Sequence, residues 1–332
     1  MKAPHFWSAG LDPRSREAAP LTRILLTPLA ALYTMGIRRK LANAKPAAVP
    51  VPIICVGNLT VGGVGKTPVV DAIRRMASEA GLRAASLSRG YGGSLSGPLR
   101  VDPASHAAAE VGDEPLMLAA SGEAWIGRDR AEAARAMAAD GVRLIVMDDG
   151  HQNPSVAKDL SLIVIDAAAP FGNGFVLPKG PLREPVADGL ARAQGVVLMG
   201  EGKELTAVQK SRLPVLRAAI APSGAVPEGP LVAFAGIGRP VKFFDGLKAA
   251  GADLREGVPY GDHHVFTAGD LRFLHDLAAS HGARLITTTK DHVRLPADER
   301  QRILAFPVEA RFEDEAALRA LLAPVLHPAK AR

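Results

Sequence analysis

Short apolar runs recur along the first two thirds of the chain and alternate with stretches of helical character. Most are rich in Val, Ile and Leu, and they cover residues 51–56, 83–88, 142–148, 160–166 and 195–199. Helices are predicted between several of them, over residues 68–80, 115–120 and 130–139. Such alternation indicates an α/β fold, with a mostly parallel sheet and helices on both of its faces.

A stretch rich in proline and glycine, residues 221–230, interrupts this pattern and is typical of a boundary between structural units. Beyond it, a second α/β unit is predicted from strands at 231–235 and 284–289, with a helix ending near Ala250. We therefore predict three parts: an N-terminal segment (1–45), a core (46–220) and a smaller α/β domain that closes over the site of the core (221–332).

The N-terminal segment contains an apolar run of 14 residues, 24–37, with basic residues at both ends. A helix needs about 20 residues to span a bilayer, so the run is too short to cross one. An amphipathic helix lying at an anionic membrane surface is the favoured interpretation. A core helix of the folded body is an alternative. A cleaved signal peptide is disfavoured, because Arg38, Arg39 and Lys40 separate the run from the cleavage-like residues 42–44.

The charge distribution supports this interpretation. Residues 1–50 hold eight basic and two acidic side chains, which account for the whole net charge of +6. The rest of the chain is neutral and poor in aromatic residues, so nucleic-acid binding is not expected. The single cysteine, Cys55, excludes an intramolecular disulfide framework and fits a reducing cytoplasm.

The first chemical signal lies between the run at 51–56 and the helix predicted from Pro68. A glycine-rich turn between a strand and a helix can point successive backbone N–H groups at phosphate oxygens. A lysine in it reaches the β- and γ-phosphates, and the following hydroxyl ligates Mg²⁺. The usual pattern of such P-loops has glycine at position 60. The candidate nucleotide-binding residues are Thr60, Val61, Gly62, Gly63, Val64, Gly65, Lys66 and Thr67.

The second signal is an apolar strand that ends in two carboxylates, Asp148 and Asp149, followed by Gly150. Next to a P-loop, an acidic residue in this position holds Mg²⁺ directly or through water. Together, the two signals predict a P-loop NTPase-like core that binds ATP and Mg²⁺.

Several polar segments add to this pattern. They are residues 88–93, 112–115, 148–152, 178–185, 234–240 and 262–266, and with residues 56–68 they occur in an order that resembles the tetraacyldisaccharide 4′-kinase family. The resemblance covers roughly residues 5 to 310, and threonine at position 60 is itself a trait of that family. It implies transfer of the γ-phosphoryl group of ATP to the 4′-hydroxyl of a tetraacylated glucosamine disaccharide 1-phosphate, a step of lipid A biosynthesis in Gram-negative bacteria.

The resemblance also implies roles for individual residues. Asp113 resembles the general base for the sugar hydroxyl, supported by His263, while Lys66 and Arg183 act near the phosphates. The implied metal-binding residues are Thr67, Asp148, Asp149 and Glu114. Arg89, Gln152 and Glu184 match further motif positions. One departure is that many relatives have histidine where this chain has Asn153, while His151 lies two positions earlier.

Family members are peripheral proteins of the cytoplasmic face of the inner membrane. The expected partners are therefore the lipid substrate and the membrane surface, and the chain is expected to act as a monomer. The alternatives are a P-loop kinase with another acceptor and a P-loop GTPase or ATPase. A guanine-reading motif is disfavoured, because residues 289–292 place His292 where the specificity-giving aspartate would stand.

Overall fold

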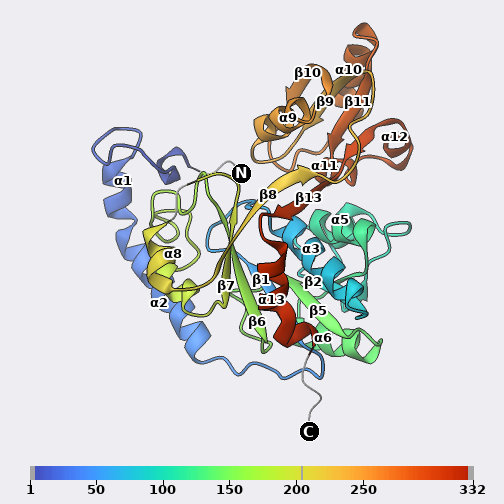
Figure 1. The fold of residues 1–332 in the computed structure, drawn as a ribbon. Coiled ribbons are helices and arrows are strands. Elements are labelled where there is room, and N and C mark those ends of the chain that lie inside the picture. Colours follow the sequence, from blue (N-terminus) through green and yellow to red (C-terminus); the bar gives the residue numbers. More distant parts are fainter. Residues whose placement is uncertain (1–3, 203–204, 328–332) are drawn as a thin grey trace.

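The computed structural model describes residues 4–202 and 205–327, which form two lobes around two sheets (Figure 1). The large sheet has nine strands in the order β13-β8-β7-β6-β1-β5-β2-β4-β3. Its inner pairs are parallel, and only its two outermost pairs are antiparallel. Its strands are β1 (Ile53–Gly57), β2 (Ala84–Ser88), β3 (Leu99–Arg100), β4 (Ala124–Ile126), β5 (Leu144–Asp148), β6 (Leu160–Asp166), β7 (Gly195–Met199), β8 (Val215–Pro222) and β13 (Val308–Phe312).

Helices cover both faces of this sheet, which confirms the predicted α/β class. Ile54 and Val56 of β1 pack into one core cluster, whereas Ile53 packs into another on the opposite face. Burial on both faces explains why the central strands are continuous apolar runs. The helices of the large lobe are α3 (Lys66–Glu79), α4 (Ala108–Val111), α5 (Asp113–Ser121), α6 (Arg130–Ala139), α7 (Val186–Leu190), α8 (Thr206–Ser211) and α13 (Glu315–Leu326).

The small lobe holds a four-stranded sheet whose strands are all parallel, in the order β10-β9-β11-β12. Its elements are β9 (Pro230–Ala235), α9 (Pro240–Ala249), β10 (Asp253–Pro259), α10 (Ala268–Ser280), β11 (Arg284–Thr288), α11 (Thr289–His292), α12 (Ala297–Arg302) and β12 (Leu304–Phe306).

The small lobe is an insertion in the large one. β8 leads into it and β13 leads out, and the two strands pair antiparallel from Val308–Pro222 to Phe312–Ala218. Figure 1 shows both strands extending from the large sheet toward the smaller one. The sequence pattern predicts that all of residues 221–332 belong to the second unit. The pairing instead places β13 in the large sheet, and α13 packs into the core of the large lobe.

The N-terminal segment forms two helices where one was predicted over residues 24–37. A short 3-10 helix, η1 (His5–Trp7), precedes α1 (Pro20–Leu25) and α2 (Thr27–Ala42). Pro28 lies in the first turn of α2. It has no N–H to donate to Ile24, so the helix is interrupted there and begins again. Because Ala30 is the one buried residue of these two helices, the alternative of a core helix is wrong.

The last helix should be essential to the large core. Leu322 of α13 is fully buried in the cluster that also holds Ile54 and Val56. Leu322→Ala is expected to lower the free energy of unfolding by about 3 kcal/mol, because truncating a buried leucine leaves a cavity. Equilibrium urea denaturation measures this. Leu29→Ala on exposed α2 is the matched control and should change it by less than about 0.5 kcal/mol. Equal effects of the two substitutions would contradict the assigned packing.

Candidate functional site

The phosphate-binding loop lies between β1 and α3. Helix α3 begins at Lys66, two residues before the predicted start at Pro68. Gly62 and Gly65 adopt φ values of 110° and 87°, in the left-handed region that favours glycine. Thr60, which replaces the usual first glycine, has no such conformation and pairs with Leu182 in an isolated antiparallel bridge. A side chain is therefore tolerated at position 60, and the loop is supported by the neighbouring segment.

Lys66 and Arg183 converge on Asp149. The Lys66 ammonium lies 3.5 Å from Oδ1 of Asp149, and the Arg183 guanidinium donates to both carboxylate oxygens at 2.8 and 2.9 Å. Burial alone would raise the pKa of Asp149, but the two cations outweigh it and hold the pKa below its usual value. The structure thus brings these three predicted residues together.

Asp148 makes no direct contact of this kind, and the charge of Lys66 offsets its burial only in part. Its side chain is buried at the end of β5, and neither carboxylate oxygen has a hydrogen-bond partner among the described residues. Burial, followed by the nearby charge of Glu114, raises the pKa of Asp148 to about 7. A buried carboxylate without a donor is stabilised by a cation, so the surroundings of Asp148 fit Mg²⁺.

The donors around Asp148 are the kind that a nucleotide-bound Mg²⁺ takes. In the described part of the chain, no group of three or more His, Cys, Asp or Glu side chains could hold a metal ion by itself. Magnesium at phosphate-transfer sites uses one or two carboxylates, and water and phosphate oxygens complete its coordination. Thr67 lies next to Lys66, half-buried in the first turn of α3.

Glu184 and Gln152 are linked by hydrogen bonds to the backbone at the start of the loop. Glu184 is fully buried and accepts two hydrogen bonds from Arg192, at 2.8 and 2.7 Å, and one from Gln152 at 2.9 Å. Gln152 also donates to the backbone carbonyl of Asn58, and the Asn58 amide donates to the carbonyl of Thr60. No role was predicted for either partner: Arg192 lies outside the motif segments, and Asn58 lies within the 56–68 segment but outside its phosphate-binding residues 60–67.

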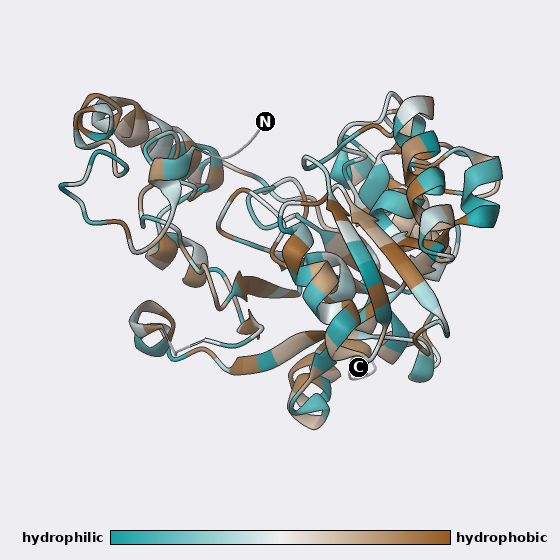
Figure 2. Ribbon diagram, turned by 90° about the horizontal axis from the view of Figure 1, so that it is seen from above, coloured by the Kyte–Doolittle hydropathy of each residue, from teal (hydrophilic) through white to brown (hydrophobic). Residues whose placement is uncertain are grey.

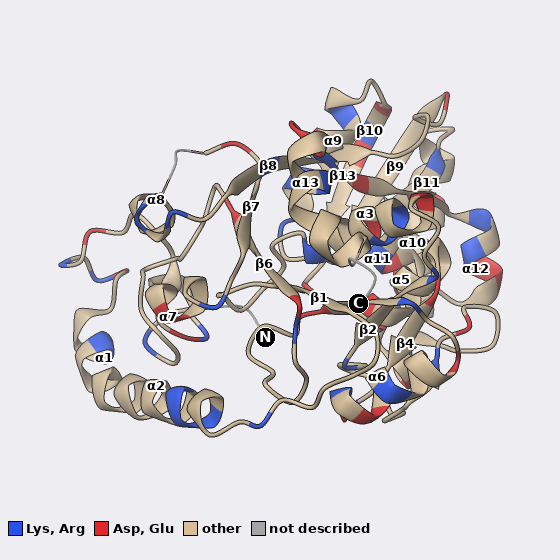
Figure 3. Cartoon of the chain, turned by 60° about the horizontal axis from the view of Figure 1, so that its bottom comes forward, with Lys and Arg blue, Asp and Glu red and all other residues tan. Residues whose placement is uncertain are grey.

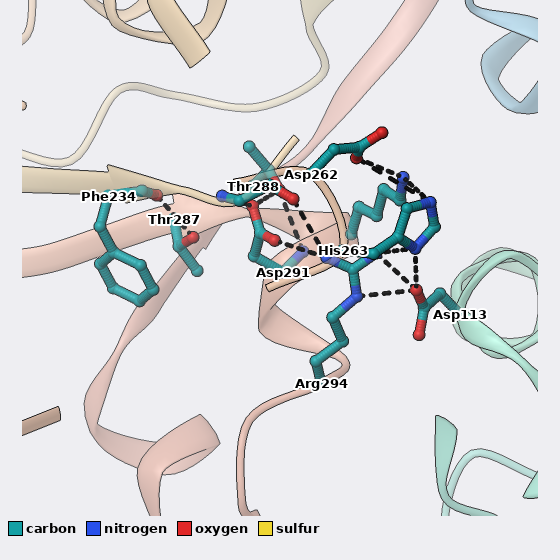
Figure 4. Close-up of polar contacts among 10 residues, drawn as sticks. Asp113, Phe234, Asp262, His263, Thr287, Thr288, Asp291 and Arg294 are labelled. Atoms are coloured by element: carbon teal, nitrogen blue, oxygen red, sulfur yellow. Dashed lines mark hydrogen bonds and ion pairs between the residues drawn. The ribbon is translucent and has the colours of Figure 1, made fainter. Parts of the chain in front are cut away.

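Asp113 begins α5 and meets the small lobe there (Figure 4). Its Oδ2 atom lies 3.1 Å from Nδ1 of His263 and accepts a hydrogen bond from Nε of Arg294 at 2.7 Å. The predicted Asp113–His263 pair is therefore in contact across the lobes. Arg294 was not predicted, although it lies only two residues after the 289–292 segment that was considered as a guanine-reading motif.

The glycine-rich segment at residues 88–93 packs against the turn before Asp113. Gly112 has a φ of 91°, and a Cβ there would lie 2.5 Å from the carbonyl oxygen of Tyr91. A Cβ on Gly93 would lie 2.5 Å from the carbonyl oxygen of Glu110. Glycine is required at both positions. The close packing of the two segments therefore fixes the position of Asp113 at the start of α5. Arg89 is exposed, and its charge, after burial, helps to lower the pKa of Arg130 to about 10.

A second ionic contact joins the lobes. Asp166, at the end of β6, lies 2.9 Å from the guanidinium of Arg239 and 3.6 Å from the ammonium of Lys242. The two cations belong to the start of α9 in the small lobe. Two contacts, at the ends of β6 and at the start of α5, thus hold the small lobe over the carboxyl edge of the large sheet.

A glycine-rich loop between β1 and α3, a buried carboxylate without a hydrogen-bond donor and an Asp–His pair formed across two lobes are together typical of a P-loop phosphotransferase. The comparisons narrow this class. The family model described as tetraacyldisaccharide-1-P 4′-kinase matches residues 22–327. The chain belongs to the tetraacyldisaccharide 4′-kinase family.

Relatives support this assignment over the whole length. A tetraacyldisaccharide 4′-kinase of Hyphomonas neptunium is 69% identical over 98% of both chains. One of Rhodospirillum centenum is 56% identical over 98% of this chain and 97% of its own. The crystal structure of LpxK from Aquifex aeolicus in complex with ATP superposes with a TM-score of 0.74 at 26% identity, covering 92% of this chain and 100% of that one.

His151, the departure from the family motif, is buried beside Gly189. Its Nε2 atom lies 3.0 Å from the Gly189 carbonyl oxygen, so Nε2 carries the proton and donates it. Burial, followed by the charge of Arg192, lowers the pKa of His151 to about 3. His151 therefore fills space as a neutral ring and does not reach the Asp113 side of the site.

This burial predicts a pH-dependent stability. Below pH 6.5 a histidine in the unfolded chain binds a proton, whereas buried His151 stays neutral until about pH 3. Proton binding therefore stabilises the unfolded state relative to the folded state as the pH falls. The free energy of unfolding should fall by about 1.4 kcal/mol per pH unit between these values from this residue alone. Urea titrations at several pH values should show a smaller slope for His151→Gln, whereas exposed His5→Gln should keep the wild-type slope. Equal slopes in all three proteins would contradict the assignment.

Proposed function

We propose that the chain transfers the γ-phosphoryl group of ATP to the 4′-hydroxyl of a tetraacylated glucosamine disaccharide 1-phosphate, giving the bis-phosphorylated precursor of lipid A. The observation that carries the proposal is the meeting of Asp113 and His263 from different lobes, on the same edge of the sheet as the phosphate-binding loop. Family membership supports the identity of the acceptor.

Each residue of the site has a proposed role. The backbone of residues 60–67 and the Lys66 ammonium hold the β- and γ-phosphates. Bound Mg²⁺ neutralises charge that builds up on the transferring phosphoryl group. Thr67 and Asp148 are the proposed direct ligands, because Asp148 has no other partner. Glu114 and Asp149 lie close by and add negative charge, with Asp149 also held by Lys66 and Arg183.

Asp113 is the proposed acceptor of the hydroxyl proton, and His263 orients its carboxylate. Phosphoryl transfer depends chiefly on positioning and charge neutralisation, so the base needs no unusual pKa. The small lobe excludes water when it lies against Asp113. A GTPase is disfavoured further, because Lys290 and Asp291 of the residue 289–292 segment contact His263 and Arg294 instead of being free to read a base.

We also propose that α1 and α2 lie on an anionic membrane surface at the cytoplasmic face of the inner membrane. Figure 2 shows where hydrophobic residues lie along the ribbon, and Figure 3 shows α1 and α2 along one edge of the molecule with basic segments and no acidic ones. Leu25 and Leu32 are 76% and 59% exposed. A groove of about 1100 Å³ separates α2 from the body, bordered by Phe175 and Lys179.

The depth of this contact is limited. No helix in the described part of the chain is long and apolar enough to cross a bilayer. Exposed leucines flanked by arginine and lysine suit shallow burial among headgroups. In this arrangement a monomer would reach a lipid substrate from the side of the membrane, with the small lobe remaining in water.

The kinase proposal is tested by transfer of radiolabelled phosphate from ATP to the tetraacylated disaccharide 1-phosphate in mixed micelles. Lys66→Ala should abolish labelled lipid without unfolding the protein, because the loop loses its charge on the phosphates. Asp113→Ala should lower kcat by about 100-fold or more while ATP still binds. Lys210→Ala, an exposed lysine of α8, is the matched control. ATP hydrolysis without labelled lipid would point to another acceptor or to a hydrolase.

The membrane proposal is tested by flotation with vesicles of phosphatidylethanolamine and phosphatidylglycerol. Replacing both Leu29 and Leu32 with aspartate should weaken binding about 100-fold, since two exposed leucines contribute about 3 kcal/mol when buried. Val241→Asp, at an exposed apolar position of the small lobe, should have no effect. Undiminished flotation of the double variant would show that another surface binds the membrane.

A further inference from the structure

Arg294 lies closer to Asp113, the proposed base, than the motif residue His263 does, at 2.7 Å against 3.1 Å from Oδ2. Its side chain is 8% exposed, and both Nε and Nη2 donate to Oδ2 of Asp113, with Nε at 2.7 Å (Figure 4). This two-nitrogen contact on one oxygen belongs to the small lobe, whereas Asp113 belongs to the large one. The contact therefore exists only while the lobes touch.

Other residues of the small lobe fix the position of the Arg294 guanidinium. Its Nη1 atom donates to Oδ1 of Asp291 at 2.9 Å, and to the carbonyl of Gly236 at 3.3 Å. Asp291 is fully buried, and its Oδ2 accepts hydrogen bonds from the Gly236 amide at 2.9 Å and the Thr288 hydroxyl at 2.8 Å. Because each donor and acceptor is used, Arg294 meets Asp113 in one fixed orientation.

The two carboxylate oxygens of Asp113 have different surroundings. Oδ2 accepts hydrogen bonds from Arg294 and lies 3.1 Å from Nδ1 of His263, whereas no described side chain or backbone group donates a hydrogen bond to Oδ1. The His263 ring lies between two cations, because the Lys290 ammonium is 3.2 Å from its Nε2 atom and Nη2 of Arg294 is 3.0 Å from its Nδ1 atom. Its Nδ1 atom also lies 3.1 Å from the same Oδ2 atom of Asp113.

We propose that Arg294 is a positioning residue for phosphoryl transfer, because it holds Oδ2 of Asp113 so that Oδ1 faces the acceptor hydroxyl. As the hydroxyl oxygen bonds to the γ-phosphorus, the bond from that phosphorus to the bridging oxygen of ADP breaks, and the hydroxyl proton passes to Oδ1. Arg294 touches neither the acceptor nor the phosphate in this arrangement. The inference rests on the proposed kinase reaction and assigns the reacting atom of its base.

Steady-state kinetics of Arg294→Gln test the inference. Misplacing a catalytic group by about 1 Å can cost about 100-fold, so kcat should fall by that order while the KM for ATP stays within about twofold. Arg294→Lys should recover part of kcat, because it keeps the charge but cannot form the paired contact. Arg272→Gln, an exposed arginine of α10, is the matched control and should match the wild type.

A double variant separates positioning from a general structural effect. If Arg294 acts through Asp113, Arg294→Gln should cause no further loss of kcat in the Asp113→Ala background. An equal loss in both backgrounds, or an unchanged kcat in the single variant, would overturn the inference. Should thermal unfolding show that the glutamine variant is unfolded, Arg294→Lys carries the same comparison. A wild-type chain that transfers no phosphate would overturn the proposed function itself. An active wild type with an unaffected Arg294→Gln variant would overturn only the role of Arg294.

Discussion

Two adjacent carboxylates at the end of β5, buried Asp148 and half-buried Asp149, constrain the charges around them. Each raises the cost of ionising the other unless cations lie close. Lys66 and Arg183 pair with Asp149, whereas neither carboxylate oxygen of Asp148 has a hydrogen-bond partner among the described residues. In the proposed reaction, the phosphates of ATP and Asp149 would share the Lys66 ammonium, which lies 3.5 Å from Oδ1 of Asp149.

The sequence predicts the central elements well, because strands buried on both faces are continuous apolar runs and because a P-loop has few substitutes. It does not reveal β8 and β13, whose buried and exposed positions are mixed as expected at the edge of a sheet. The Asp113–His263 contact follows from family resemblance alone. Arg294 could not be predicted, because its role depends on Asp291, Thr288 and Gly236 meeting in three dimensions.

Charged contacts join the lobes on two sides, and Val293 of the small lobe also packs against the apolar cluster of the large lobe. Arg294 and His263 meet Asp113 on one side, and Arg239 and Lys242 meet Asp166 on the other. Such contacts form and break more easily than packed side chains, because water can replace each partner. The arrangement of the reacting groups at Asp113 therefore depends on both lobes.

The insertion of the small lobe has a consequence for how the protein is made. Leu318, Leu322 and Val325 of α13 complete the core cluster that β1 begins more than 250 residues earlier in the chain. The ribosome adds about 5–20 residues per second, so the apolar face of the large sheet stays uncovered for many seconds after β1 has emerged. Translation must run through residue 326 before the phosphate-binding loop rests on a finished core. A chain that ends before α13 thus leaves apolar surface of the large sheet exposed to water.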